Sequence, residues 1–153
     1  YIGDARMLDK NELNNYFICD HCHQKIETVN LGFLEWLTPE RGKVEKFHIV
    51  HNDAKCLYDV KPAAPSWELR SGIDENGFIN LLGMVDEVSD AEALANLLDT
   101  IERLTIPNYE LVRNSLEAAR KSGEVDFNTK PGFPSPAEIA AVLRYQNGEQ
   151  VYK

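Results

Sequence analysis

Hydrophobic and polar residues alternate with a period of two in two neighbouring stretches, residues 31–37 and residues 44–51. This period places alternate side chains on opposite faces, which is typical of β-strands. Between the stretches, residues 38–43 contain Pro39 early and Gly42 late, a composition that favours a turn. The pattern therefore predicts an antiparallel β-hairpin over residues 31–51.

From about residue 74 onward, apolar residues recur at the three- and four-residue spacings of amphipathic helices. Ser89 and Glu92 have the spacing of a capping box, and Pro107 is expected to end the helix that follows. A further helix is expected from near Tyr109 to a stop at Gly123. The apolar positions that mark these helices are Phe78, Leu81, Leu82, Val85, Leu94, Leu97, Leu98, Ile101, Leu104, Tyr109, Val112, Leu116 and Ala119.

A last helix is predicted from a second capping box, formed by Ser135 and Glu138, with Pro136 at the first helical position. It carries apolar residues at Ile139, Val142 and Leu143, and Gly148 is expected to end it. We therefore expect three or four helices in the second half of the chain.

The composition changes around residues 61–65, which read Lys-Pro-Ala-Ala-Pro and are typical of a linker. We expect a β-hairpin module in residues 1–60, a linker in residues 61–73 and a helical region in residues 74–153 that can share one core with the module. Residues 1–15 are polar and are expected to form a short helix or an ordered arm.

The 153-residue chain has an ordinary apolar fraction of 43%, a mean hydropathy of -0.39 and a formal net charge of -9. No apolar run approaches the ~20 residues that a membrane span needs, and the first residues lack the pattern of a signal peptide. Neither half of the chain has a basic excess. Because nucleic-acid affinity rests on lysine and arginine, the charge disfavours DNA or RNA as a partner.

Three cysteines and one histidine have the spacing of a metal site: Cys19-x2-Cys22, then 28 residues, then His51-x4-Cys56. Thiolate and imidazole are the ligands that Zn²⁺ prefers, and a structural zinc takes four of them at tetrahedral corners. The predicted hairpin supplies the path by which the second pair returns to the first. Three cysteines cannot all pair inside one chain, so we expect reduced thiols and a cytoplasmic protein.

The remaining histidines are weaker ligand candidates. His21 and His23 flank Cys22 inside the expected turn, where a neighbour points away from the metal. His48 is three residues from His51, so a strand places it on the opposite face. We prefer His51 as the ligand, with His48 as the alternative.

Residues 16–60 resemble the zinc-ribbon and treble-clef class of structural zinc modules. The resemblance lies in Cys19 and Cys22, in the apolar Ile26 four residues after the second cysteine, and in the hairpin with a distant second ligand pair. It implies a zinc ion and a local fold, and it implies no particular activity.

Catalytic alternatives find little support in the sequence, and we expect no catalytic residues. A zinc hydrolase would need an open metal position, with Cys56 not a ligand and Asp53 or Glu35 as base. An HNH-type nuclease resembles the chain only at residues 47–52, and the later histidine that would complete its metal site is missing.

The sequence thus predicts an α+β fold with an N-terminal zinc-bound β-hairpin module, followed by helices. We expect a protein-interaction or regulatory module with a structural Zn²⁺ and a protein partner. The alternative is a nucleic-acid-associated zinc ribbon that would use Lys43, Lys46 and Lys55 of the hairpin region.

Overall fold

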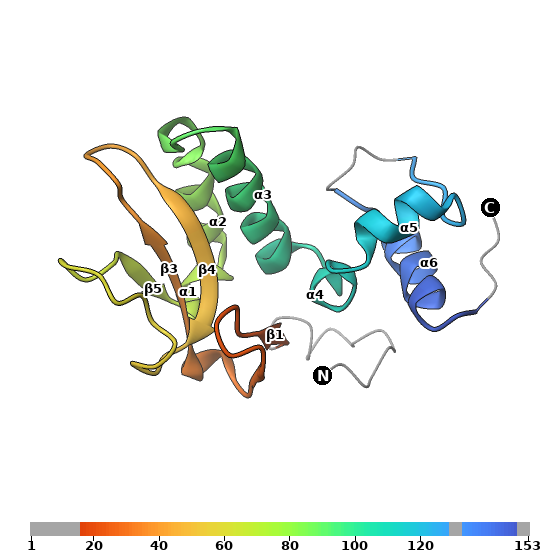
Figure 1. Ribbon diagram of the computed structural model, residues 1–153, viewed down its shortest axis with the longest axis horizontal. Helices are drawn as coiled ribbons and strands as arrows, with labels where there is room; N and C mark the ends of the chain where they lie inside the picture. Colours follow the sequence, from red (N-terminus) through yellow and green to blue (C-terminus); the bar gives the residue numbers. More distant parts are fainter. Residues whose placement is uncertain (1–15, 129–132, 150–153) are drawn as a thin grey trace.

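The computed structural model describes residues 16–128 and 133–149, and its fold is mixed α+β, as the sequence predicts. Strands occupy the first part of the chain and helices most of the rest (Figure 1). The expected helix or arm at residues 1–15 lies outside the described residues. The elements are β1 (Phe17–Ile18), β2 (Lys25–Ile26), the 3₁₀-helix η2 (Val29–Leu31), β3 (Gly32–Leu37), β4 (Glu45–His51), β5 (Ser66–Glu68), α1 (Leu69–Gly72), α2 (Glu75–Leu82), the 3₁₀-helix η3 (Val85–Glu87), α3 (Ala91–Thr105), α4 (Tyr109–Val112), α5 (Leu116–Ser122) and α6 (Pro136–Gln146).

The predicted hairpin is confirmed: β3 and β4 pair in antiparallel fashion, with Gly32 opposite His51. The register shifts between Glu35 and Leu37, and Lys46 on the facing strand has a left-handed φ of 55°. Such a bulge leaves backbone groups without a ladder partner. Asn96 of α3 supplies one, because its amide bonds both the N–H (2.6 Å) and the carbonyl (2.9 Å) of Phe47.

Residues 66–72, which the sequence places in a linker, form β5 and α1. β5 pairs with the free edge of β3, so the sheet order is β4-β3-β5. The aromatic rings of Trp36 and Trp67 meet edge to face with centroids 5.1 Å apart. The two prolines of residues 61–65 give the segment the composition of a linker. The strand β5 that follows is instead stabilised by its pairing with β3 and by the contact of Trp67 with Trp36.

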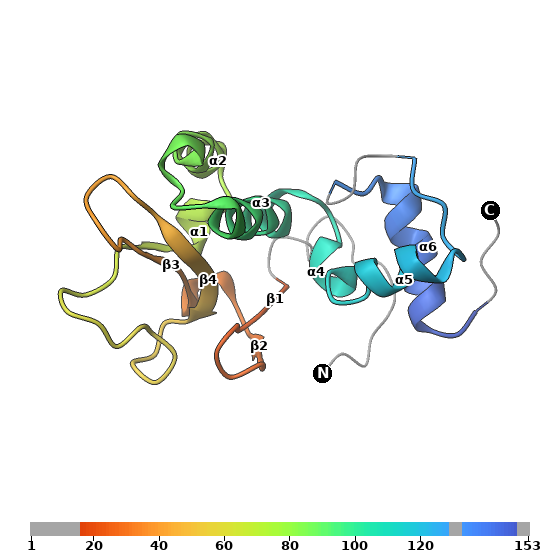
Figure 2. The ribbon, with the colours of Figure 1, turned by 45° about the horizontal axis from the view of Figure 1, so that its top comes forward.

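Helices cover one face of the three-stranded sheet. α3 packs against β4 and α1 packs against β3, while α2 packs mainly on α1 and α3 (Figure 2). These elements enclose one hydrophobic cluster that runs from Phe17 to Leu104 and includes Leu34, Ile49, Leu69 and Leu97, all fully buried. The helices α1 to α3 therefore share a core with the hairpin.

A second hydrophobic cluster begins at Tyr109 and is formed by α4, α5 and α6, at the other end of the molecule in Figure 1. The helix expected from Tyr109 to Gly123 is broken between Val112 and Leu116. Asparagine and serine at positions 114 and 115 are poor helix formers, which is consistent with a break there. Whether the chain divides into domains at residues 61–73 stays a prediction.

The helix ends largely follow the sequence signals. Ser135 and Glu138 form the predicted capping box with Pro136 in the first turn, and Gly123 ends α5 with a left-handed φ of 75°. The expected cap at Ser89 is displaced by one residue. Asp90 caps α3 through Ala93 N–H at 2.8 Å, while the Ser89 backbone bonds to the hairpin.

Within the described ranges, no helix has the length and apolar character that crossing a bilayer requires.

Candidate metal centre

The first two candidate ligands lie in a tight turn between the short strands β1 and β2. The turn is closed by backbone bonds from Cys19 N–H to the Gln24 carbonyl and from His23 N–H to the Cys19 carbonyl, both 2.9 Å. Cys22 N–H points at the Cys19 sulfur at 3.5 Å. Ile26 is buried directly after the turn, as expected for an apolar residue that supports it. The local sequence therefore brings both sulfurs to one side of the turn.

The second pair comes from the end of the hairpin. His51 is the last residue of β4, and Cys56 lies in the following turn, where its N–H bonds the Asp53 carbonyl at 2.8 Å. Asp20 N–H also bonds the Ile49 carbonyl at 2.8 Å, which joins the first turn directly to β4. The hairpin thus provides the return path that the ligand spacing requires.

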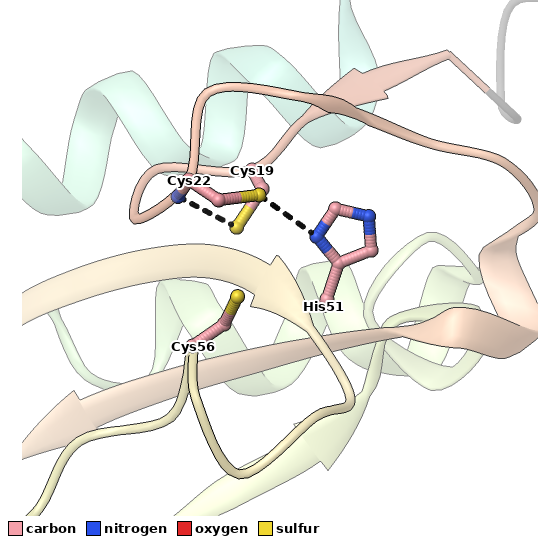
Figure 3. A group of neighbouring side chains, drawn as sticks. All are labelled: Cys19, Cys22, His51 and Cys56. Atoms are coloured by element: carbon pink, nitrogen blue, oxygen red, sulfur yellow. Dashed lines mark hydrogen bonds between the residues drawn. The ribbon is translucent and has the colours of Figure 1, made fainter.

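The four residues meet in space. One ligand atom from each of Cys19, Cys22, His51 and Cys56 lies within 4.8 Å of the others (Figure 3). A zinc ion bound at about 2.3 Å from each sulfur has tetrahedral edges of about 3.8 Å, so closing around such an ion needs only a small contraction. The donor set and its geometry both fit a four-coordinate metal ion.

The orientation of His51 indicates which ring nitrogen would bind the ion. Its Nδ1 lies 3.3 Å from the Cys22 sulfur, inside the cluster. Its Nε2 lies 3.2 Å from the Lys25 carbonyl, outside the cluster, and can donate its proton there. A metal-binding histidine commonly donates its other N–H to such an acceptor, which fixes the tautomer. Nδ1 of His51 is therefore the candidate ligand atom.

The thiols of the cluster have unequal acidity. Burial by itself raises the pKa of Cys19, but nearby N–H donors, chiefly that of Cys22, lower it to about 7. Burial, followed by the closeness of Cys19 and Cys22, raises the pKa of Cys56 to about 11. Packing three sulfurs so closely disfavours three thiolates, and a divalent cation at the centre removes that repulsion.

The other histidines lie outside the cluster, as the sequence predicts. His21 and His23 are exposed. His48 faces away from His51: its Nε2 lies 2.7 Å from Glu35, and its ring stacks on Tyr58 with centroids 3.8 Å apart. The buried carboxylate of Glu35 and the ring of Tyr58 hold the His48 side chain in place, on the side of the strand away from the cluster.

Glu35, which the sequence marks as a candidate base, instead holds the loop that carries Cys56. Its Oε1 accepts a hydrogen bond from Tyr58 N–H at 3.0 Å, and the Tyr58 hydroxyl donates to the Lys46 carbonyl at 2.7 Å. The other candidate base, Asp53, is exposed and accepts from Lys55 N–H at 3.0 Å. Both carboxylates serve local structure.

A network that the sequence does not predict fixes the first turn from the opposite side. The buried guanidinium of Arg103 bonds Asp20 at 2.7 Å and forms a two-pronged pair with Glu110 at 2.8 and 2.7 Å. Glu110 also accepts from Ile18 N–H at 2.9 Å. The contacts of Arg103 with Asp20 and of Glu110 with Ile18 join residues 83 and 92 positions apart in sequence, so no local pattern could reveal them.

An open pocket of about 620 Å³ adjoins the cluster. Its polar lining includes Asp20, His48 and Tyr58, each of which already has the structural partner described above. Cys56 forms part of the same wall and belongs to the cluster. The rest of its polar lining, at His21, Lys55 and Asp59, is exposed to solvent.

Two of the three lysines of the nucleic-acid alternative lie beside acidic groups. Lys46 is exposed and borders a cavity together with Glu45, Asp90 and Glu92. Lys55 lies 4.0 Å from the carboxylate of Asp53. Lys43 follows the hairpin turn, with its N–H bonded to the Glu40 carbonyl.

Comparison of the chain with models of protein families, with curated proteins and with solved structures found no match.

Proposed function

We propose that Cys19, Cys22, His51 and Cys56 bind one structural zinc ion, and that the chain acts as a zinc-stabilised protein-interaction module. The observation that carries the zinc proposal is the meeting of four soft ligand atoms within 4.8 Å. Thiolate and imidazole donors favour Zn²⁺ over Mg²⁺ or Ca²⁺, which prefer oxygen.

A structural role is favoured over a catalytic one because all four tetrahedral positions have a protein ligand. A catalytic zinc keeps one position for water. The ion would join the β1–β2 turn to the end of β4, two segments that Asp20 links through its hydrogen bonds to the carbonyl and the N–H of Ile49. We expect the ion to stabilise the part of the first hydrophobic cluster that contains Phe17, Ile26 and Ile49.

The experiment is metal analysis of the tag-free protein, purified without added zinc, and of two matched histidine variants. We expect about one equivalent of zinc in the native protein and in His48→Ala, and a large loss in His51→Ala. Native protein without zinc, whose thermal stability is unchanged by EDTA, would refute the proposal. Equal zinc loss in both variants would argue against His51 as the specific ligand.

A protein partner is favoured over nucleic acid by the charge around the hairpin. The candidate lysines Lys46 and Lys55 have carboxylates beside them, at Glu45 and Asp53 respectively. The carboxylates beside these lysines would repel the negatively charged phosphates of a nucleic acid. Nucleic-acid association at Lys43, Lys46 and Lys55 therefore ranks second, and absent or salt-insensitive binding of DNA and RNA would eliminate it.

A further inference from the structure

The helix α2 presents apolar side chains to solvent along its outer side. Leu81 is fully buried against the core, whereas Phe78, Ile79, Leu82 and Val85 are exposed by 37, 61, 46 and 38%. Residues three or four apart lie on one helical face, so the first three are neighbours on α2. Val85 follows about one turn later, in η3. We call these four exposed residues the α2 surface.

The sequence segment that contains the α2 surface, between Arg70 and Arg103, carries charged residues of a single sign. The 32 residues from 71 to 102 contain eight acidic residues and no lysine or arginine. The acidic residues are Asp74, Glu75, Asp86, Glu87, Asp90, Glu92, Asp99 and Glu102. This segment accounts for most of the net charge of -9.

Three of these carboxylates have structural roles, Glu102 is buried, and Glu75, Asp86 and Glu87 lie near the ends of the α2 surface. Asp74 and Asp90 cap α2 and α3, and Asp99 pairs with Arg113. No ion pair within the described ranges engages Glu75, Asp86, Glu87 and Glu92. Glu75 lies at one end of the apolar row, and Asp86 and Glu87 directly follow its last member.

We propose that the α2 surface binds a basic amphipathic helix of another protein, which deepens the proposed interaction function by naming its surface and partner. An apolar row with a polar rim marks a binding site. A partner helix with apolar residues at i, i+3, i+4 and i+7 would cover Phe78, Ile79, Leu82 and Val85. Its lysines or arginines would meet the carboxylates at both ends of the row.

The same charge disfavours the other possible occupants. Two copies of this surface would bring like charges together, which opposes self-association. An anionic membrane surface would be repelled for the same reason. A basic helix is the occupant that satisfies both the apolar row and its acidic flanks.

The test uses the zinc-loaded 153-residue chain and a synthetic peptide of about 18 residues, with leucine at i, i+3, i+4 and i+7 positions and lysine elsewhere. Binding is measured by fluorescence anisotropy. We expect saturable binding that weakens as KCl rises from about 50 to about 500 mM. The double variant Ile79→Ser with Leu82→Ser should weaken it about tenfold, and Val60→Ser, at an exposed apolar residue outside the surface, by less than about twofold.

A second pair of variants tests the charge with equal loss of carboxylates. Asp86→Asn with Glu87→Gln should weaken binding about threefold, and Glu40→Gln with Glu124→Gln, in other exposed loops, should leave the affinity close to that of the native protein at the same salt concentration. All these substitutions are at surface positions, and circular dichroism checks that the fold is retained.

Several results would overturn the inference: no binding of the peptide, equal binding by the native protein and the serine variant, or a native dimer that the serine variant converts to a monomer. Equal affinity for a scrambled peptide of the same composition would also overturn the inference, because it would show that binding depends on charge and not on an apolar helical face. Zinc content is measured for every sample. Binding by a protein that takes up no zinc would refute the zinc proposal alone, and zinc-loaded protein without binding would refute this inference alone.

Discussion

The guanidinium of Arg103 lies 2.7 Å from the carboxylate of Asp20, so the last turn of α3 is joined to the turn that carries Cys19 and Cys22. The same guanidinium pairs with Glu110 at the start of the second hydrophobic cluster. One buried cation therefore connects the candidate metal turn, the long helix and α4.

Replacing Arg103 with methionine is expected to destabilise the protein strongly. The substitution keeps the volume of the side chain but leaves the buried carboxylate of Glu110 and that of Asp20 without their partner. Breaking a buried pair in this way costs about 3–5 kcal/mol. Urea unfolding of the zinc-loaded protein measures the change.

The double substitution Arg103→Met with Glu110→Leu is the control, because it also removes the more deeply buried of the two carboxylates that lose their partner. It should recover part of the lost stability. A loss below about 1 kcal/mol in Arg103→Met alone would contradict the role assigned to this pair.

The parts of the fold that the sequence predicts are those that neighbouring residues determine. The alternation over residues 31–51 yields the hairpin, and the capping box at Ser135 yields the start of α6, because both signals lie within a few residues of their effect. The metal cluster is predictable for a different reason. Cysteine is a scarce residue in this chain, and the spacing of Cys19 and Cys22 is typical of a metal-binding turn.

The parts that the sequence does not predict depend on distant partners. Trp67 becomes a strand residue because β3 offers an edge and Trp36 offers a ring. In the sequence, Asp20 is indistinguishable from other polar turn residues, and only the fold shows its ion pair with Arg103. The displaced cap of α3 also depends on a distant partner. The Ser89 N–H bonds the Val44 carbonyl in the hairpin, and Asp90 caps the helix instead of Ser89.

Replacing Glu35 with alanine is expected to loosen the loop that carries Cys56. The change leaves Tyr58 N–H and His48 without their acceptor, and an unsatisfied buried donor costs about 1–3 kcal/mol. Zinc stoichiometry should stay near one, while transfer of zinc to a colorimetric chelator becomes faster. Glu35→Gln, which keeps an acceptor oxygen, should have a smaller effect, and transfer rates that are equal in all three proteins would contradict this role.

Replacing Asn96 with alanine tests the support of the bulge in β4. Its side chain satisfies both backbone groups of Phe47, which lie where the register of the β3–β4 ladder shifts. Losing two partly buried hydrogen bonds is expected to cost about 2 kcal/mol in the free energy of unfolding. The neighbouring Ala95→Gly lies on the exposed side and should cost only about 1 kcal/mol, from helix propensity. If Asn96→Ala is at least as stable as Ala95→Gly, the side chain of Asn96 does not support the bulge.

The pH dependence of stability is expected to carry a contribution from Glu102. This side chain is buried, and burial, followed by the neighbouring charge of Asp99, raises its pKa from 4.5 to about 7. Its Oε2 has no hydrogen-bond partner within the described residues. The folded state therefore holds the proton more tightly than the unfolded state. Its contribution to stability is full below about pH 4.5 and is lost as the pH rises to about 7.

The variant Glu102→Gln isolates this contribution, because the thiols of the metal cluster titrate in both proteins. The difference in unfolding free energy between variant and native protein should increase in favour of the variant by about 1–3 kcal/mol between pH 4.5 and 8. Asp99, Tyr109 and Arg113, the groups that face Glu102, are unchanged in this comparison. A difference that is constant with pH would show that Glu102 titrates alike in the folded and unfolded states, and the burial of its charge would then have no energetic consequence.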